Sequence, residues 1–200
     1  SVEGGGAVSG PVSNEGAIHV TPGHALTMNG ELVNGGEIRV DAVATVRFAG
    51  GYAGSGFISG AGASLFEGGL RPGDSPTLMQ VEGDMVLGDA NETVLEIAGL
   101  ARGTQYDALD VGGHLTLGGT LRIALLDGFQ LAAGQSFLLF DAGLLDGGFA
   151  DLLLPEIDGL TLAWGRDSHS LRLSVQAVPV PDMAWMFAAV ALWIHRRRRP

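Results

Sequence analysis

Short runs of alternating apolar and polar residues follow one another from residue 17 to residue 178, separated by Gly, Asn or Asp. Clear examples occupy residues 37–40, 43–48, 94–97 and 171–175. Alternation bounded by turn-forming residues is typical of β-strands. No helical period of 3.6 residues precedes residue 183. The pattern therefore predicts an all-β chain with one C-terminal apolar helix.

An internal repeat indicates how the strands are arranged. Residues 81–88 and 111–118 share the form V-x-G-x-[ML]-x-L-G at an offset of 30 residues. Imperfect repeats of a strand-turn unit favour a β-solenoid, in which each turn buries its apolar face on the next. Short strands separated by turns also suit a β-sandwich, which is the main alternative. Because the strands lengthen from Gln80 onward, we expect solenoid coils over residues 1–79 and a sandwich-like cap over residues 80–177.

The C-terminus differs from the rest of the chain. Residues 183–194 form a run of 12 apolar residues without a charge. The arginines Arg196, Arg197, Arg198 and Arg199 follow, and such a cluster beside an apolar helix is typical of a membrane segment. Twelve helical residues span about 18 Å, against about 30 Å of hydrocarbon. This length favours a transient membrane segment over a permanent anchor, with a buried core helix as the alternative.

A short proline motif precedes this helix. Val178, Pro179, Val180 and Pro181, together with the apolar run and the arginines, resemble a PEP-CTERM sorting signal of the VPLPA type. The resemblance covers residues 178–200 and implies recognition by an exosortase-type membrane protease. It also implies export to the surface or matrix of a Gram-negative bacterium that makes exopolysaccharide. The chain departs from the family pattern at Val180 and at Asp182, which replaces a small residue.

The body resembles a second group. The stretches at residues 70–76, 81–84, 105–111, 117–121, 134–137 and 147–152 are similar, in this order, to the C-terminal end of autotransporter-type passengers. Thr77 replaces the last glycine of the usual Pro-Gly-x-Ser-Pro-Gly run. The resemblance implies a right-handed β-helix with a cap, usually without catalytic residues of its own.

Charge and composition narrow the possible functions. Residues 1–182 carry 7 arginines and 22 acidic residues, so nucleic acid is not an expected partner of the body. The chain has no cysteine and no lysine, which excludes disulfides, thiolate metal sites, Schiff-base chemistry and a Walker A loop. It starts at Ser1 without a visible export signal, so we expect that a signal was removed or that the chain is a fragment.

Several polar residues could in principle carry chemistry. Asp167, Ser168 and His169 have the residue types of a catalytic triad, but consecutive positions favour a hairpin loop. His19 and His24 bracket a turn and lack a third metal ligand. We therefore expect no metal and no cofactor at these positions.

The remaining candidates are isolated. His114 precedes a strand and is expected to face solvent. Asp107 and Asp110 lie beside glycines, as in calcium-binding turns, but each can instead cap a turn, as can Asp74. A last set of residues is expected at solvated strand positions: Arg39, Arg47, Arg122 and Arg172.

Taken together, these features predict an exported, non-enzymatic protein of the cell surface or extracellular matrix, with a structural or adhesive role. Its expected partners are the exosortase-type protease, the membrane through the C-terminal helix, and exopolysaccharide as a further candidate. One alternative is a passenger fragment of an autotransporter-type adhesin. Another is a β-helix enzyme that cleaves glycans, which clustered Asp, Arg and His side chains on one face would favour.

Overall fold

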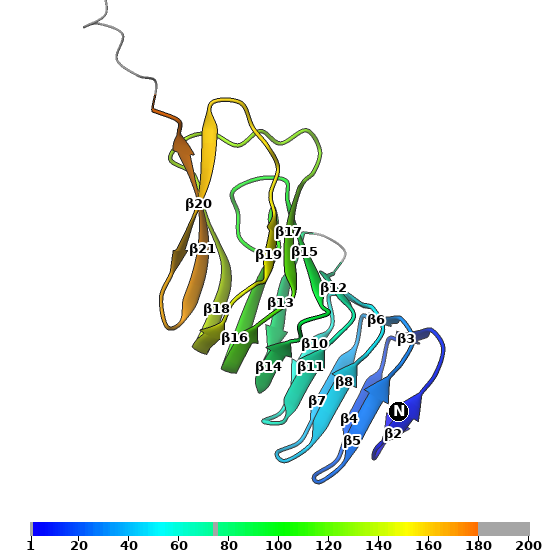
Figure 1. Ribbon diagram of the computed structural model, residues 1–200. Coiled ribbons are helices and arrows are strands. Elements are labelled where there is room, and N and C mark those ends of the chain that lie inside the picture. The colour runs from blue at the N-terminus through cyan, green and yellow to red at the C-terminus, as the bar shows by residue number, and fades with distance from the viewer. Residues whose placement is uncertain (1, 74–75, 180–200) are drawn as a thin grey trace, which may run out of the picture.

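The computed structural model describes residues 2–73 and 76–179, which form a stack of parallel strand-turn coils (Figure 1). Every regular element in these ranges is a strand, so this part of the chain is an all-β fold of the β-solenoid class. The helix expected over residues 183–194 lies outside the described residues. Within the described ranges, no helix is long and apolar enough to cross a bilayer.

Each turn of the solenoid contributes up to three strands. The first position is occupied by β1 (Val2–Glu3), β4 (Ala17–Val20), β7 (Glu37–Val40), β10 (Phe57–Ser59) and β13 (Leu78–Val81). The second position is occupied by β2 (Gly6–Val8), β5 (Ala25–Met28), β8 (Thr45–Phe48), β11 (Ala63–Phe66) and β14 (Asp84–Leu87). The long strand β16 (Ala108–Leu117) pairs with both β13 and β14, and so joins the two positions into one sheet.

The third position forms a separate seven-stranded sheet. Its strands are β3 (Val12–Asn14), β6 (Leu32–Asn34), β9 (Tyr52–Gly54), β12 (Gly69–Pro72), β15 (Glu92–Ile97), β17 (Thr120–Leu125) and β19 (Asp151–Leu153). All neighbours in this sheet are parallel. Parallel stacking lets the backbone groups of one turn bond to the next turn.

The register shows two spacings along the chain. In the N-terminal coils Ile18 pairs with Ile38, a step of 20 residues that the sequence interpretation missed. Further along, Val81 pairs with Val111 and Met85 with Leu115. These pairs match the 30-residue repeat seen in the sequence, so that repeat reflects two stacked turns.

A continuous core fills the solenoid. Strands such as β4, β5 and β11 alternate exposed or half-buried residues with buried ones, as expected for strands with one face inward. Phe48, Tyr52 and Phe66 are each about 1% exposed or less, and their ring centroids lie 4.7–5.4 Å apart. Such aromatic contacts add to the burial that holds successive turns together.

A ladder of buried polar side chains links three successive turns of the stack. Asn14 Nδ2 donates to Asn34 Oδ1 at 2.7 Å, and Asn34 Nδ2 donates to the Tyr52 hydroxyl at 3.0 Å. All three side chains are buried, and burial raises the pKa of Tyr52 to about 12. This ladder satisfies polar groups inside the core, which would otherwise be costly to bury.

A column of glycines marks one corner of the stack. A Cβ on Gly30 would lie 2.0 Å from the carbonyl oxygen of Gly10, and a Cβ on Gly50 would lie 2.3 Å from that of Gly30. A Cβ on Gly68 would lie 2.0 Å from the carbonyl oxygen of Gly50. Only glycine permits the backbones of successive turns to approach this closely.

The C-terminal part adds antiparallel strands. β18 (Ser136–Gly147) is parallel to β16 and antiparallel to β21 (Ser170–Ala177), which in turn pairs with β20 (Leu160–Arg166). Parallel stacking thus continues past residue 80 to β18 and β19, and the antiparallel strands are confined to residues 136–177. The lengthening expected from residue 80 is seen in β16 and β18, which have 10 and 12 residues.

Candidate functional site on the polar face

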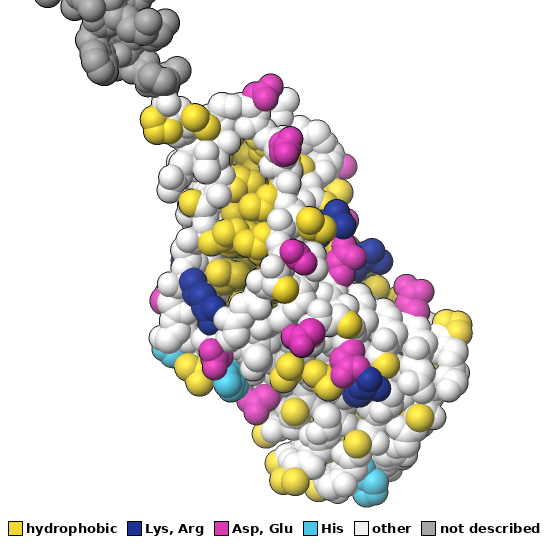
Figure 2. Space-filling view, in the orientation of Figure 1, with side chains coloured by type: hydrophobic (Ala, Val, Ile, Leu, Met, Phe, Trp, Pro, Cys, Tyr) yellow, Lys and Arg dark blue, Asp and Glu magenta, His cyan; other side chains and the backbone are white. Residues whose placement is uncertain are grey.

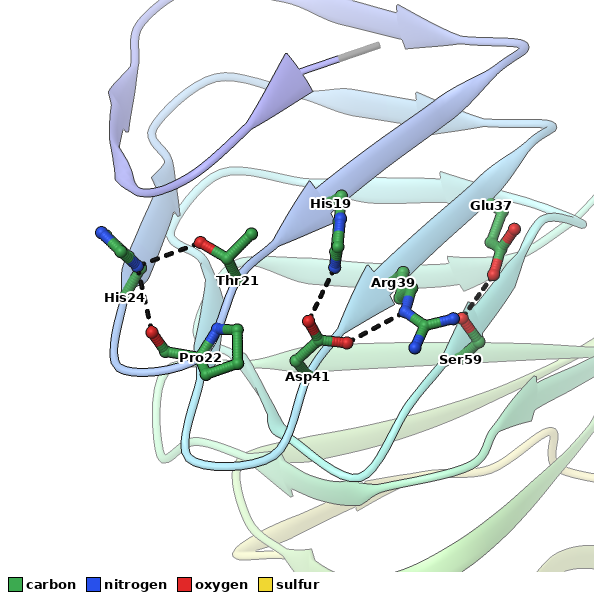
Figure 3. A network of polar contacts seen from close by, with 8 residues as sticks. All are labelled: His19, Thr21, Pro22, His24, Glu37, Arg39, Asp41 and Ser59. Atoms are coloured by element: carbon green, nitrogen blue, oxygen red, sulfur yellow. Dashed lines mark hydrogen bonds and ion pairs between the residues drawn. The ribbon is translucent and has the colours of Figure 1, made fainter.

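A network of polar side chains lies on the outer side of the first-position strands (Figure 3). His19 on β4, Arg39 on β7 and Ser59 on β10 occupy one register position in three successive turns. Strand alternation turns Ile18 and its stacked partners inward, so these polar residues share the opposite side of the strands. The 20-residue step therefore brings together residues that are distant in the sequence.

Asp41 is the centre of this network. Its Oδ2 lies 2.8 Å from Nε2 of His19, and its Oδ1 accepts a bond of 2.9 Å from Nε of Arg39. The Arg39 and His19 bonds hold the pKa of Asp41 below its usual value. The Asp41 hydrogen bond raises the pKa of Arg39. Both shifts follow from the mutual pairing, which favours the charged form of each group and makes each a poorer proton-transfer residue at neutral pH.

An open groove of about 500 Å³ continues the same face toward the C-terminus. We refer to it as the acidic groove. The side chains that characterise it are Phe57, Gln80, Glu82, Asp110 and Asp141, from or beside strands β10, β13, β16 and β18. The ring of Phe57 is half-buried, so part of it is accessible from the groove.

The carboxylates of the acidic groove have different surroundings. Glu82 Oε2 accepts a 2.8 Å bond from the backbone N–H of Gly60, and Asp110 pairs with Arg102 at 2.5 Å. Asp141 stacks directly after Asp110 in the register and is exposed. The groove thus combines hydrogen-bond acceptors, an excess of negative charge and one aromatic ring. Such a surface suits hydroxyl-rich neutral ligands and repels anions.

The two histidines proposed as weak metal candidates are held apart by different partners. His19 contacts Asp41, whereas His24 Nδ1 lies 3.0 Å from Oγ1 of Thr21 and 3.2 Å from the carbonyl oxygen of Pro22. In residues 2–73 and 76–179, no group of three His, Asp or Glu side chains is arranged to hold a metal ion.

Asp167, Ser168 and His169 form the turn between β20 and β21. Asp167 Oδ1 accepts 2.7 Å bonds from the backbone N–H groups of His169 and Ser170, and its Oδ2 accepts from the Ser170 hydroxyl. These bonds, with that from the His169 N–H the largest, hold the pKa of Asp167 below its usual value. The arrangement agrees with the expected hairpin loop, because Asp167 orders the turn and does not orient His169.

Asp107 and Asp110 have separate roles. Asp107 is fully buried and accepts bonds from the backbone N–H of Thr77 at 2.7 Å and of Glu96 at 2.8 Å. The Thr77 bond spans 30 residues, so Asp107 connects two turns. The Glu96 bond spans 11 residues and holds the loop that precedes Asp107. Asp110 belongs to the acidic groove. Asp74 lies outside the described residues.

His114 differs in part from the sequence prediction, which placed it before a strand and facing solvent. It lies within β16, is half-buried, and has a buried Nε2 that finds no hydrogen-bond partner. Its backbone N–H donates to Asp84 Oδ1 at 2.8 Å. The expectation that His114 precedes a strand was wrong, because β16 extends through this position and pairs with β18 there.

The strand arginines lie at outward positions, and three of them pair with carboxylates. Arg39 bonds Asp41, Arg47 pairs with Glu67, and Arg122 bonds Glu92 at 2.6 Å. Arg172 is exposed on β21. The Arg47 and Arg122 pairs each join adjacent turns of the solenoid.

The sorting residues fall at the boundary of the described chain. Val178 and Pro179 follow β21 and are exposed, and the Val178 N–H donates to the carbonyl oxygen of Gly159 at 2.9 Å. Val180, Pro181 and residues 196–199 lie outside the described residues.

The acidic groove was not identified from the sequence. Its residues are spread from position 57 to position 141, and only the stacking register brings them together. The offset of 30 that relates Gln80 to Asp110 was the available signal. No protein-family model matches the sequence, and no curated protein matches it either.

Proposed function

We propose that this chain is an exported, non-enzymatic structural or adhesive protein of the surface or extracellular matrix of a Gram-negative bacterium. Residues 178–200 act as its sorting signal, and an exosortase-type membrane protease recognises that signal. The proposal includes a right-handed winding of the solenoid, the usual hand of parallel crossovers, and a helix over residues 183–194.

The observation that carries the proposal is the construction of the body as a stacked rod. Successive turns share one core, a buried asparagine ladder and ion pairs such as Arg122–Glu92. A rod of this kind holds its outer side chains at fixed spacings, and such regularity supports a role in display or adhesion.

The sorting role is testable in a host that makes an exosortase. We expect the native chain to leave the inner membrane, and a variant with serines in place of Arg196, Arg197, Arg198 and Arg199 to accumulate unprocessed. A variant with Arg172→Ser is the matched control, because Arg172 is an exposed arginine outside the signal. Equal processing of all three proteins would argue against the sorting role.

We place the adhesive surface at the acidic groove, with neutral, hydroxyl-rich polysaccharide as its ligand class. Carboxylates accept hydrogen bonds from sugar hydroxyls, and the Phe57 ring offers a surface for sugar C–H groups. Glu82 and Asp141 would repel an anionic polymer.

The groove is tested by retention of the protein on immobilised neutral exopolysaccharide. Phe57→Ala should lower retention at least about tenfold, the effect of losing roughly 1.4 kcal/mol of binding. Val43→Ala is the control, since Val43 is 88% exposed and lies outside the groove. Unchanged retention of Phe57→Ala would remove the groove from the proposal.

One observation favours the alternative of a glycan-cleaving enzyme. The side chains of His19, Arg39 and Asp41 cluster on one face. Their mutual pairing opposes such chemistry. A catalytic arginine base would need a lowered pKa, whereas Asp41 raises the pKa of Arg39. The Arg39–Asp41 pair supports the non-enzymatic proposal, and the His19–Asp41 contact joins two turns.

A further inference from the structure

An apolar hollow opens at the C-terminal end of the molecule (Figure 2), and its lining shares no residue with that of the acidic groove. Three adjoining depressions have volumes of about 390, 480 and 590 Å³. Leu154 lines the first and the second, and Ile157 and Leu160 line the first and the third. Leu152 and Leu153 at its side are 43% and 42% exposed. We refer to these joined depressions as the apolar hollow. An apolar concavity open to water is typical of a surface that binds another protein segment, a membrane or a ligand.

The described chain ends at the rim of this hollow. The Val178 N–H bonds the carbonyl oxygen of Gly159, and Gly159 directly precedes Leu160 in the lining. Three residues separate Pro179 from Met183, where the run of 12 apolar residues begins. The four steps from Pro179 to Met183 span at most about 14 Å of extended chain, so the apolar run is tethered within reach of the hollow.

The charges beside the apolar hollow and at the C-terminus of the chain are also complementary. Glu156 and Asp158 line the depression next to Leu160, and both are exposed. The four arginines follow the apolar run directly after His195. A chain laid across the hollow could therefore bury its apolar residues and bring its arginines near acidic groups.

We propose that residues 183–194 dock into the apolar hollow of their own chain and are shielded from water until they are transferred to the membrane. The inference rests on the proposed function, which treats these residues as a sorting segment. It adds a docked state in which the signal is hidden by the body that it sorts.

Paired cysteines test the docking in the full-length chain, purified without detergent. The native sequence has no cysteine, so any disulfide must join introduced residues. Ala188→Cys is combined in turn with Leu153→Cys, Ile157→Cys or Leu162→Cys, all at or beside the hollow. At least one pair should form a disulfide within the monomer about tenfold faster than the control pair Ala188→Cys with Val43→Cys, because docking raises the effective concentration.

The outcomes separate the possible occupants. Disulfide-linked dimers whose yield rises with protein concentration would show that a second copy fills the hollow, which contradicts the proposal. Failure of all three pairs to exceed the control would also overturn it. Circular dichroism of each variant shows whether the body is folded.

The same disulfide experiment with lipid vesicles added distinguishes failure of docking from failure of sorting. Vesicles of phosphatidylethanolamine and phosphatidylglycerol should slow the intramolecular disulfide, because the tail leaves the hollow for the bilayer. If no pair forms in solution but the chain still binds the vesicles, docking is wrong and the sorting role survives. If the disulfide rate is unchanged by vesicles and the chain does not bind them, docking survives and the membrane role fails.

Discussion

The N-terminal coils and the C-terminal part bury their apolar residues in different ways. In the coils, a step of 20 residues places Ile38 on Ile18, and strands of three or four residues close around the core. In the C-terminal part, turns are longer, β16 and β18 extend to 10 and 12 residues, and β20 pairs only with β21. The first region is closed on itself, whereas the second leaves the apolar hollow open.

The two regions differ in whether a further turn covers the apolar residues of each turn. A regular turn is covered by the next turn of the same length, so its core needs no other partner. Leu152 and Leu153 lie on β19, the last strand of the seven-stranded sheet, where no further strand of the described chain covers them, and they stay exposed. The open region is therefore where the molecule has surface available for a further segment.

The largest expected effect is on the free energy of unfolding, when one side chain in each region is truncated. Phe66→Ala should lower the free energy of unfolding by about 3–5 kcal/mol, because Phe66 is fully buried against Phe48 and Tyr52. Leu162→Ala, at the half-buried wall of the hollow, should cost about 1 kcal/mol. Denaturant unfolding of both variants measures the difference. Equal losses would contradict the contrast between a closed and an open region.

The glycine column tests the close approach of the turns. Gly50→Ala should cost about 2–3 kcal/mol, because its Cβ would lie 2.3 Å from the Gly30 carbonyl oxygen. Gly16→Ala is the matched control, since a Cβ there meets nothing within 4 Å, and it should stay within about 0.5 kcal/mol of the native chain. Thermal unfolding of the two variants separates crowding from the general effect of losing a glycine.

The buried tyrosine makes the closed region sensitive to alkali. Burial raises the pKa of Tyr52 to about 12, above the value of about 10 in the unfolded chain. The protonated Tyr52 hydroxyl makes its full contribution to the free energy of unfolding below pH 10. As the pH rises from 10 to 12, this contribution falls by roughly 2 kcal/mol, because the unfolded chain releases the proton first. Tyr52→Phe should remove this part of the pH dependence. A native chain equally stable at both pH values would contradict the burial of the hydroxyl.

The smallest effect is expected from the ion pairs between turns. Arg122 and Glu92 are 47% and 43% exposed, so their coupling energy should not exceed about 0.5 kcal/mol and should vanish in high salt. A double-mutant cycle with Arg122→Ala and Glu92→Ala measures it. A coupling above about 2 kcal/mol would mean that surface pairs, and not the core, hold the turns together.

Strand alternation and the 30-residue repeat were sufficient to predict an all-β solenoid, because inward and outward positions follow directly from residue type. The 20-residue step was also visible, since Asn14 and Asn34 each lie two residues before a glycine and four before an isoleucine. The acidic groove could not be predicted in this way. It depends on the stacking register of residues such as Phe57, Glu82 and Asp141, which no local pattern encodes.

The same limit applies to His114 and to the hollow. Local sequence suggested that His114 faces solvent, but it lies within the long strand β16, is half-buried and has a buried Nε2. Which apolar residues remain exposed depends on where the last parallel strand, β19, ends. Both features are set by contacts between distant turns.

The most direct test of the proposed export and sorting is the intact mass of the protein recovered from each fraction of its native host. The account predicts a mature chain that ends near residue 180 and lies outside the inner membrane. Recovery of a chain that still contains Arg199, in the inner membrane alone, would contradict it.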